Sequence, residues 1–217
     1  MTKYWGPLGW TTLHSVSALF PDNPTQAEIN LVKSWIQSFA ECITCPTCQG
    51  HFKTMLTLYQ ARHPDMFSSR RNFSLFVFRA HNTVNRRLNK RIYTYDVLWD
   101  TLAQWDHNKA KSKRYEYLMY LRRDWGSQTT LAGITALTRV RDLYSVEQDY
   151  WSHRQLDWNA VKSVIQPTDD ITSPIVEPKQ PNVTTIVHPM SSFATVSSKT
   201  TFRIRGVPAG SLSLISR

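Results

Sequence analysis

The sequence predicts an all-α protein, a four-helix bundle plus a short fifth helix, followed by a helical C-terminal extension and a disordered tail. Through the first half of the chain, apolar side chains recur at three- and four-residue steps, which is the spacing of one helix face. The connections between these stretches are short, which favours antiparallel neighbours in a bundle. Only seven glycines occur in 217 residues, which argues against a turn-rich all-β fold.

Each bundle helix has its own boundary signals. The four helices are expected over residues 9–20, 25–40, 46–62 and 72–88, and the short fifth helix over residues 95–105. Thr25 and Glu28 have the spacing of a capping box, which marks a helix start. Pro46 suits a first helical turn, and the dipeptide His63-Pro64 is typical of a helix end.

The composition divides the chain into three regions. Residues 1–107 hold the predicted bundle. Residues 108–166 form an extension in which the stretches 113–124 and 131–166 are expected to be helical. Residues 167–217 are rich in Pro, Ser and Thr, and repeated prolines interrupt any regular element. This tail is therefore expected to be disordered or weakly ordered.

Several classes of protein are disfavoured by composition. No run reaches the roughly 18 to 20 apolar residues of a membrane helix, and residues 1–23 lack the pattern of a signal peptide. We therefore expect a protein of the cytoplasm that does not enter a membrane. The three cysteines lie within seven positions, which indicates chemistry rather than a disulfide scaffold.

A basic band runs through the middle of the chain. The formal net charge is +10, and the excess lies between residues 50 and 125, mainly in the stretches 70–91 and 109–123. Such residues commonly form solvated helix faces. An excess this uneven also suits an anionic partner, which would be a phosphate-bearing cofactor, an acidic protein or nucleic acid.

Cys42, Cys45, Cys48 and His51 are spaced by three residues, and two interpretations compete. A zinc site needs four ligands that converge at roughly 2.0 to 2.3 Å. Helical side chains three residues apart rise by about 4.5 Å and rotate away from one another, so they cannot close a tetrahedron, and we expect no metal here. A redox dithiol needs only two cysteines at a helix N-terminus, where N–H groups and the dipole favour thiolate. Simple burial explains a lone cysteine better than three together.

Four segments together resemble the Erv/ALR family of FAD-dependent sulfhydryl oxidases. They are Trp10-Thr11-Thr12-Leu13-His14, Phe20-Pro21-Asp22, Cys45-Pro46-Thr47-Cys48-Gln49-Gly50-His51-Phe52, and the stretch from His81 to Lys90. The resemblance covers roughly residues 4–105 in the family's order. It implies a helical bundle that holds FAD at its mouth, with the flavin ring beside the dithiol. The implied reaction oxidises thiols to a disulfide and reduces oxygen to hydrogen peroxide.

The resemblance also implies roles for the cysteines. In the family the dithiol is followed by two residues and then His-Phe or an equivalent, which selects Cys45 and Cys48 as the catalytic pair. Cys48 would lie against the flavin and hand over the electron pair. Cys45 would be the outer thiol that exchanges disulfides with the substrate. Cys42 is left as a spare thiol, a link to a partner or a structural residue.

The cofactor-binding residues implied by the resemblance are Trp10, His14, Phe52, Phe76, His81, Asn82, Val84, Asn85, Leu88 and Lys90. Trp10 and His14 share a helix face and can cover a ring of the cofactor. His81, Asn82 and Asn85 share another face and can fix the adenosine and the ring edges. Lys90, with Arg87 and Arg91 nearby, can neutralise the pyrophosphate. Core packing alone would also explain Phe52 and Phe76.

The chain departs from the family in two respects. Many members carry a second C-x-x-C on a flexible arm and a structural disulfide in the region where Tyr93 and Tyr95 stand here. This chain has neither feature, and in that respect it resembles the compact family members of large cytoplasmic DNA viruses. Those enzymes oxidise thiols that glutathione would otherwise keep reduced. The expected partners are dithiol proteins, thioredoxin-like ones among them, and oxygen.

A homodimer is also implied, through the apolar faces of the first two helices. The residues of these faces are Leu19, Ile29, Val32, Trp35 and Ile36. The alternative is that residues 108–166 cover them within one chain.

The alternative function is a basic module that binds nucleic acid or a virion on a degenerate oxidase core. Such a module would use the basic band, and we do not favour this function.

Overall fold

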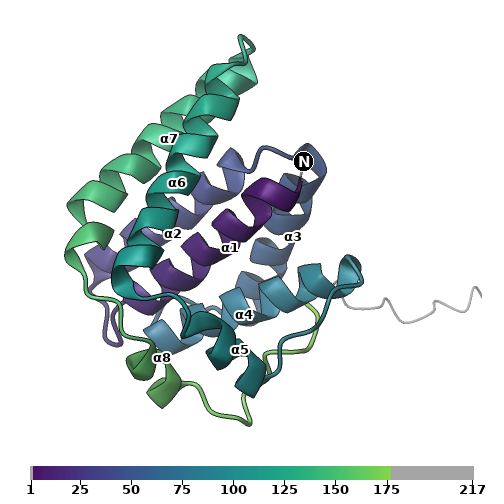
Figure 1. Ribbon diagram of the computed structural model, residues 1–217, viewed down its shortest axis with the longest axis vertical. Helices are drawn as coiled ribbons and strands as arrows, with labels where there is room; N and C mark the ends of the chain where they lie inside the picture. Colours follow the sequence, from purple (N-terminus) through teal and green to yellow (C-terminus); the bar gives the residue numbers. More distant parts are fainter. Residues whose placement is uncertain (1, 177–217) are drawn as a thin grey trace, which may run out of the picture. The chain divides into compact units, whose positions relative to one another are not determined.

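The computed structural model describes residues 2–176, and over that range the chain is helical and contains no strand (Figure 1). The helices are α1 (Thr2–Leu19), α2 (Gln26–Cys42), α3 (Pro46–Arg62), α4 (Arg70–Arg87), α5 (Tyr95–Leu102), α6 (His107–Gly126), α7 (Leu131–Asp149), the 3-10 turn η1 (Trp151–His153) and α8 (Trp158–Val164). The all-α prediction is confirmed. No helix in this range has the length and apolar character needed to span a membrane.

Local signals in the sequence set where two of the helices begin. Thr25 caps α2: its hydroxyl accepts from the backbone N–H of Glu28 at 3.3 Å, and the Glu28 carboxylate accepts from the backbone N–H of Thr25 at 2.8 Å. This is the capping box that the spacing predicted. The helix α3 runs from Pro46 to Arg62, as expected. Proline at the first position costs no hydrogen bond, because that N–H has no partner within the helix.

Three predicted helix boundaries are wrong by six residues or more, and one of them is the start of α6, which lies at His107 rather than at residue 113. The helix α1 begins at Thr2, well before residue 9, and contains Pro7 in its interior, where the sequence would favour a helix break. The stretch 131–166 is not continuous, because α7 ends at Asp149. At Tyr150 the backbone departs from helical dihedral angles, and the side chain of the next residue, Trp151, is fully buried in the core. Burial of this large aromatic side chain outweighs the propensity to continue the helix.

The centre of the bundle is a cluster of aromatic side chains from different helices. The rings of Phe39 in α2 and Phe52 in α3 lie 5.6 Å apart, and those of Phe52 and Phe76 in α4 lie 6.2 Å apart. Tyr117 in α6 lies 5.5 Å from Phe39. All four residues are buried. Because Phe52 comes about one turn after Cys48, the packing that holds α3 in place also holds the dithiol.

The extension packs along the bundle. The helix α6 lies against α1, α7 lies against α2, and α6 and α7 pair with each other (Figure 1). The ring of Trp151 in η1 lies edge-on to Trp35 of α2 at 6.0 Å. The indole N–H of Trp125 in α6 donates to the carbonyl of Cys42 at 2.8 Å. The contacts group residues 2–176 as one unit, so residues 108–166 share the core of the bundle.

This packing covers the faces that suggested a homodimer. Leu19, Val32, Trp35 and Ile36 are buried within one chain, and Ile29 is partly buried. Glu28, next to this face, accepts from the Tyr150 hydroxyl at 2.7 Å and pairs with Arg154. The structure thus agrees with the alternative in which the extension covers these faces, and they no longer argue for a second subunit.

Residues 167–176, which were expected to begin a weakly ordered tail, lie along α4. The side-chain amide of Asn82 donates to the carbonyl of Ile171 at 2.8 Å, and the backbone N–H of Ile175 donates to the Thr83 hydroxyl at 2.9 Å. Ile171 and Ile175 are buried. Two buried isoleucines, together with these hydrogen bonds and the ion pairs Arg71–Asp169 and Arg79–Asp170, hold a segment whose overall composition is polar. The rest of the predicted tail, from residue 177 on, lies outside the described residues.

A buried ion pair joins α6 to α7. Arg114 and Glu147 are linked twice, from Nε to Oε2 at 2.8 Å and from Nη2 to Oε1 at 2.9 Å, and both side chains are at most 4% exposed. We expect Glu147→Ala to lower the free energy of unfolding by about 3 to 5 kcal/mol, because the Arg114 charge is then buried without its partner. Urea denaturation at neutral pH measures this loss.

The matched control is Asp142→Ala on the same helix. Asp142 pairs with Arg139 in an exposed position, and such pairs contribute little to stability. We expect this variant to unfold close to the wild-type urea midpoint. Equal losses in the two variants would contradict the role given to the buried pair.

Candidate functional site

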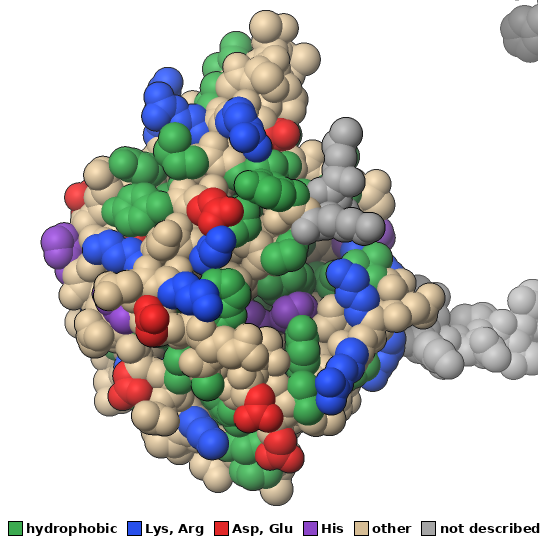
Figure 2. All heavy atoms as spheres, viewed as in Figure 1, with side chains coloured by type: hydrophobic (Ala, Val, Ile, Leu, Met, Phe, Trp, Pro, Cys, Tyr) green, Lys and Arg blue, Asp and Glu red, His purple; other side chains and the backbone are tan. Residues whose placement is uncertain are grey.

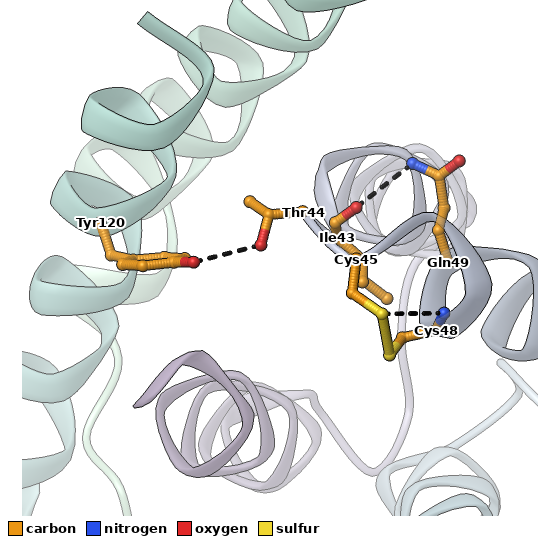
Figure 3. Close-up of a disulfide and its surroundings, with 6 residues drawn as sticks. All are labelled: Ile43, Thr44, Cys45, Cys48, Gln49 and Tyr120. Atoms are coloured by element: carbon orange, nitrogen blue, oxygen red, sulfur yellow. Dashed lines mark hydrogen bonds between the residues drawn. A yellow bond between two sulfur atoms is a disulfide. The ribbon is translucent and has the colours of Figure 1, made fainter. Parts of the chain in front are cut away.

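The dithiol is built into the first turn of α3. Cys45 is the N-cap of this helix, Pro46 is its first residue, and Cys45 and Cys48 form a disulfide (Figure 3). The Cα atoms of the two cysteines are 5.2 Å apart, and the backbone N–H of Cys48 points to the Cys45 sulfur at 3.3 Å. N–H groups and the helix dipole at this position favour a thiolate once the disulfide is opened.

The loop that precedes the dithiol is held from both sides. The hydroxyls of Thr44 and of Tyr120 in α6 are 3.2 Å apart and share a hydrogen bond (Figure 3). The side-chain amide of Gln49 reaches back from α3 and donates to the carbonyls of Glu41 at 2.7 Å and Ile43 at 3.4 Å. The extension therefore touches the residue that immediately precedes Cys45.

Cys42 is separated from this chemistry. It is the last residue of α2 and is fully buried, and its thiol points to the carbonyl of Ala136 in α7 at 3.6 Å. Burial, together with the nearby carboxylate of Glu41, raises the pKa of the Cys42 thiol to about 12. The thiol is protonated at neutral pH, which gives Cys42 the character of a structural residue.

A cavity of about 630 Å³ adjoins the dithiol, with walls mainly from α1, α3, α4 and α5 and single residues from α2 and α8. The walls include Cys48 but not Cys45. Figure 2 looks onto a hollow with a histidine on its floor, hydrophobic side chains around it, and Lys and Arg side chains beside it. One sulfur of the disulfide thus belongs to the cavity wall, and the other lies outside it.

Two histidines meet in the wall of the cavity. His14 Nε2 and His81 Nδ1 are 2.9 Å apart, so one ring donates a hydrogen bond to the other. The ring of Trp10 stacks on His81 at 4.2 Å, nearly parallel. Burial lowers the pKa of His14 to about 3, and burial, the His14 ring and Lys90 hold the pKa of His81 well below its usual value. Both rings are therefore neutral at physiological pH.

The end of α4 positions the basic side of the cavity. Asn89 follows the last turn with φ of 52°, a left-handed conformation that asparagine tolerates better than most residues. The backbone N–H of Lys90 then donates back to the carbonyl of Asn85 at 2.8 Å. This turn ends the helix and places Lys90 in the cavity wall beside Arg87.

Part of the basic band is neutralised within the fold. Arg70, Arg71, Arg79, Lys113 and Arg114 each pair with a carboxylate. Arg87 and Lys90, which line the cavity, are among the residues of the band that have no acidic partner within residues 2–176. Uncompensated positive charge is therefore found at the cavity, where it can attract an anionic ligand.

The structure brings most of the predicted cofactor residues together. Those that line the cavity are Trp10, His14, Phe52, His81, Val84, Asn85, Leu88 and Lys90. Phe76 does not line it and packs between Phe52 and Tyr59 in the core. Asn82 does not line it either, because its side chain is hydrogen-bonded to the backbone N–H and carbonyl of Tyr93 and to the carbonyl of Ile171.

Sequence reasoning missed five aromatic residues of the cavity wall, namely Trp5, Phe39, Tyr93, Trp105 and Trp158. Trp5 precedes the part of α1 that was expected to be helical. Tyr93 is held by Asn82 and places its ring edge-on to His81 at 5.2 Å. Trp105 and Trp158 lie 53 residues apart, and no periodicity in the sequence relates them.

This arrangement suits electron transfer from a dithiol to a planar ligand that carries phosphate. A disulfide at a helix N-terminus can be opened by an external thiolate. Aromatic walls can hold a ring system beside Cys48. The uncharged histidine pair adds hydrogen-bonding groups without a buried charge, and Arg87 and Lys90 can bind phosphate.

Comparison with known proteins adds independent information. The sequence model of the Erv1/Alr family matches residues 8–108. The FAD-linked sulfhydryl oxidase of African swine fever virus is 35% identical over 92 residues, which are 42% of this chain and 74% of that protein. That of Arabidopsis thaliana is 32% identical over 100 residues, 45% of this chain and 50% of that protein. The mitochondrial FAD-linked sulfhydryl oxidase of Schizosaccharomyces pombe is 31% identical over 94 residues, 43% of this chain and 50% of that protein.

The three cysteines should differ in reactivity. We expect the folded, oxidised protein to show no fast-reacting thiol, because Cys45 and Cys48 are joined and Cys42 is buried with a raised pKa. Selective reduction should expose two fast thiols, and unfolding after reduction should expose all three. Titration with a chromogenic disulfide reagent counts them.

The control for this titration is Cys42→Ser. It should leave the counts on the folded protein unchanged and remove one thiol from the unfolded count. A fast thiol before reduction that disappears in this variant would show that Cys42 is accessible, against its observed burial.

The histidine pair makes stability depend on pH. The unfolded chain binds a proton at His14 near pH 6.5, whereas the folded protein resists protonation down to a pKa of about 3. Stability is therefore fully present above the unfolded pKa and is lost as the pH falls below it. We expect the free energy of unfolding to fall by up to about 1.4 kcal/mol per pH unit from this residue, and His14→Gln to flatten that slope.

Urea denaturation at several pH values between neutrality and about pH 4 measures the slope of stability against pH. The control is His51→Gln, at an exposed position on α3. A His14→Gln slope as steep as that of His51→Gln would contradict the role assigned to the buried pair.

Proposed function

Because the chain belongs to the Erv1/Alr family, we propose that it is an FAD-linked sulfhydryl oxidase, which forms disulfides in partner proteins and reduces oxygen to hydrogen peroxide. The observation that carries this function is the Cys45–Cys48 disulfide at the start of α3, with Cys48 in the wall of a large cavity. A dithiol at the edge of a ligand site is the arrangement that the reaction requires.

The cavity suits FAD in size and in chemistry. Its volume of about 630 Å³ is within the roughly 300 to 1,000 Å³ of small-molecule sites. His14 Nδ1 and Trp5 Nε1 are buried atoms without a hydrogen-bond partner among the described residues, and both residues line the cavity. A bound ligand can supply these missing partners. Arg87 and Lys90 would hold the pyrophosphate, and the aromatic residues of the wall would hold the rings.

The two cysteines divide the reaction between them. A thiolate of the substrate attacks the Cys45 sulfur, the Cys45–Cys48 bond breaks, and Cys48 leaves as a thiolate beside the N-terminus of α3. The second substrate thiol then attacks the mixed disulfide and releases Cys45, so that the substrate loses two electrons and two protons. A bound FAD would supply the acceptor for this electron pair and the route to oxygen, which with two protons would become hydrogen peroxide.

The assignment of Cys45 as the outer thiol is supported by its position. Cys45 caps α3 and does not line the cavity, whereas Cys48 does. An incoming substrate and a bound cofactor would therefore approach the disulfide from different sides. His14 and His81, which stay neutral, would hydrogen-bond to the cofactor from the cavity wall.

The reaction itself defines the partners as dithiol substrates and oxygen. Thioredoxin-like proteins are the substrates we propose, because a dithiol at a helix N-terminus exchanges readily with another dithiol. The basic residues left unpaired near the cavity would favour acidic members of that class. We also propose a cytoplasmic place of action.

Homodimerisation stays a prediction that rests on the resemblance. The apolar faces that first suggested it are covered by α6, α7 and η1 within one chain. Sedimentation at micromolar concentration distinguishes a monomer from a dimer.

Nucleic-acid binding by a degenerate oxidase core is not favoured. The dithiol and the cavity are intact, and five residues of the basic band are paired with carboxylates inside the fold. Those five charges are not free to reach phosphates, as an electrostatic nucleic-acid site requires, and the similarity to sulfhydryl oxidases supports the oxidase instead.

Activity should depend on FAD and on one pair of cysteines. We expect the purified protein to be yellow and to consume oxygen with dithiothreitol. Cys45→Ser and Cys48→Ser should each lower turnover at least about 100-fold, as is usual on loss of a nucleophile, while FAD absorbance shows that the site is still loaded. Cys42→Ser should retain most of the activity, because that thiol is buried away from the cavity.

Two outcomes would be decisive against these assignments. A colourless, folded wild-type protein that cannot take up FAD would refute the oxidase function. An inactive Cys42→Ser variant beside an active Cys45→Ser variant would show that the catalytic pair is a different one.

A further inference from the structure

The tryptophans of this chain fall into two groups. The chain has eight, and Trp35, Trp99, Trp125 and Trp151 are buried in the core. The other four are Trp5, Trp10, Trp105 and Trp158; all line the cavity, and all are only partly buried. Large aromatic side chains that remain partly exposed around one cavity indicate a site that binds a flat ligand.

Trp158 differs from the others because it belongs to the extension. It is the first residue of α8, which lies beyond the family's matched region of residues 8–108. Its indole N–H donates to the carbonyl of Trp105 at 2.6 Å, and α8 packs against both α1 and α4. These contacts fix the position of the Trp158 ring at the cavity wall before any ligand arrives.

Trp158 and the dithiol belong to different parts of the cavity. Together with Cys48, the wall includes Phe39 of α2, Ile43 of the α2–α3 connection, and Phe52 and Met55 of α3. In Figure 1, α5 and α8 lie together at the bottom of the view, whereas α3 begins near the label of the N-terminus at the upper right. The cavity wall includes residues from both of these regions.

FAD has two ring systems joined through a pyrophosphate, and only one of them exchanges electrons with a thiol. That ring must lie beside Cys48, so the adenine ring must lie elsewhere along the cavity. The indole rings of Trp105 and Trp158 offer the adenine ring an aromatic wall. Lys109 Nζ lies 4.9 Å from the centre of the Trp105 ring. Stacking of a nucleobase on aromatic side chains is favourable for any base.

We propose that Trp158, supplied by the extension, forms the binding site for the adenine end of FAD. The inference rests on the proposed function and adds to it a cofactor contact from outside the family's domain. The extension would then have a role in holding the cofactor in addition to covering the bundle.

Comparison of FAD with FMN tests this assignment, because FMN has the same flavin ring but lacks the adenylate. We expect Trp158→Ala to weaken FAD binding about 5- to 150-fold, the range for loss of one base–aromatic stack. Its affinity for FMN should stay at the wild-type value. Titration of the flavin-free protein, followed by flavin fluorescence, measures both affinities.

Further variants separate stacking from a general loss of structure. Trp158→Phe keeps an aromatic ring and should bind FAD nearly as well as the wild type, and Trp158→Leu replaces Trp158→Ala should the latter fail to fold. Unchanged FMN affinity shows that the rest of the site is intact. Tyr144→Ala removes a partly exposed aromatic residue of α7 that does not line the cavity, and it should leave both affinities unchanged.

The inference is overturned by equal losses of FAD and FMN affinity in Trp158→Ala, or by no loss of either. An FAD affinity of Trp158→Phe as low as that of Trp158→Ala would also overturn it, since the ring would then not be the cause. A wild-type protein that takes up neither flavin would overturn the proposed function and this inference together.

Discussion

The start of α3 is the constraint on which the rest of the site depends. The Cys45–Cys48 disulfide joins two residues three positions apart, and it spans the first turn of α3. Cys45 is the N-cap of this helix and Pro46 is its first residue, so the helix begins where the disulfide requires it. The same geometry decides which sulfur faces the cavity, because the helix rotates Cys48 inward and leaves Cys45 at its outer end. The bonds from Gln49 and Tyr120 to this loop, and the packing of Phe52, hold that one turn in place.

Charge is distributed around the cavity according to the cost of burying it. A protonated imidazole in the wall would have to lose its hydration, so the His14–His81 pair stays neutral and contributes hydrogen-bonding atoms only. The permanent cations are at the end of α4, where Arg87 and Lys90 are exposed to solvent. A ligand with an uncharged ring system and an anionic linker matches this separation, whereas a ligand with its charge on the ring would not.

Local signals in the sequence predicted the elements that are determined locally. The capping box at Thr25 and the first-turn proline of α3 each marked a helix start, since both act within four residues of the boundary. Contacts between distant residues could not be foreseen in the same way. Asn82 shares a helix face with His81 and was expected to bind the cofactor, yet its side chain is used by Tyr93 and Ile171, the latter 89 positions away. Likewise, the break after Asp149 follows from the burial of Trp151 against Trp35, which periodicity within α7 cannot reveal.

The extension is part of the folded domain, because each of its helices supplies contacts that the bundle alone would lack. Helices α6 and α7 cover apolar faces of α1 and α2 that would be exposed to water without them. Tyr120 steadies the loop before Cys45, and Trp158 completes the cavity wall. Removal of α6, α7 and η1 would uncover apolar side chains of α1 and α2, Trp35 among them, so the bundle of this chain needs either its own extension or a second subunit over those faces. The buried Arg114–Glu147 pair joins α6 to α7 and thereby holds the covering layer together, which links the stability of a distant ion pair to the integrity of the redox site.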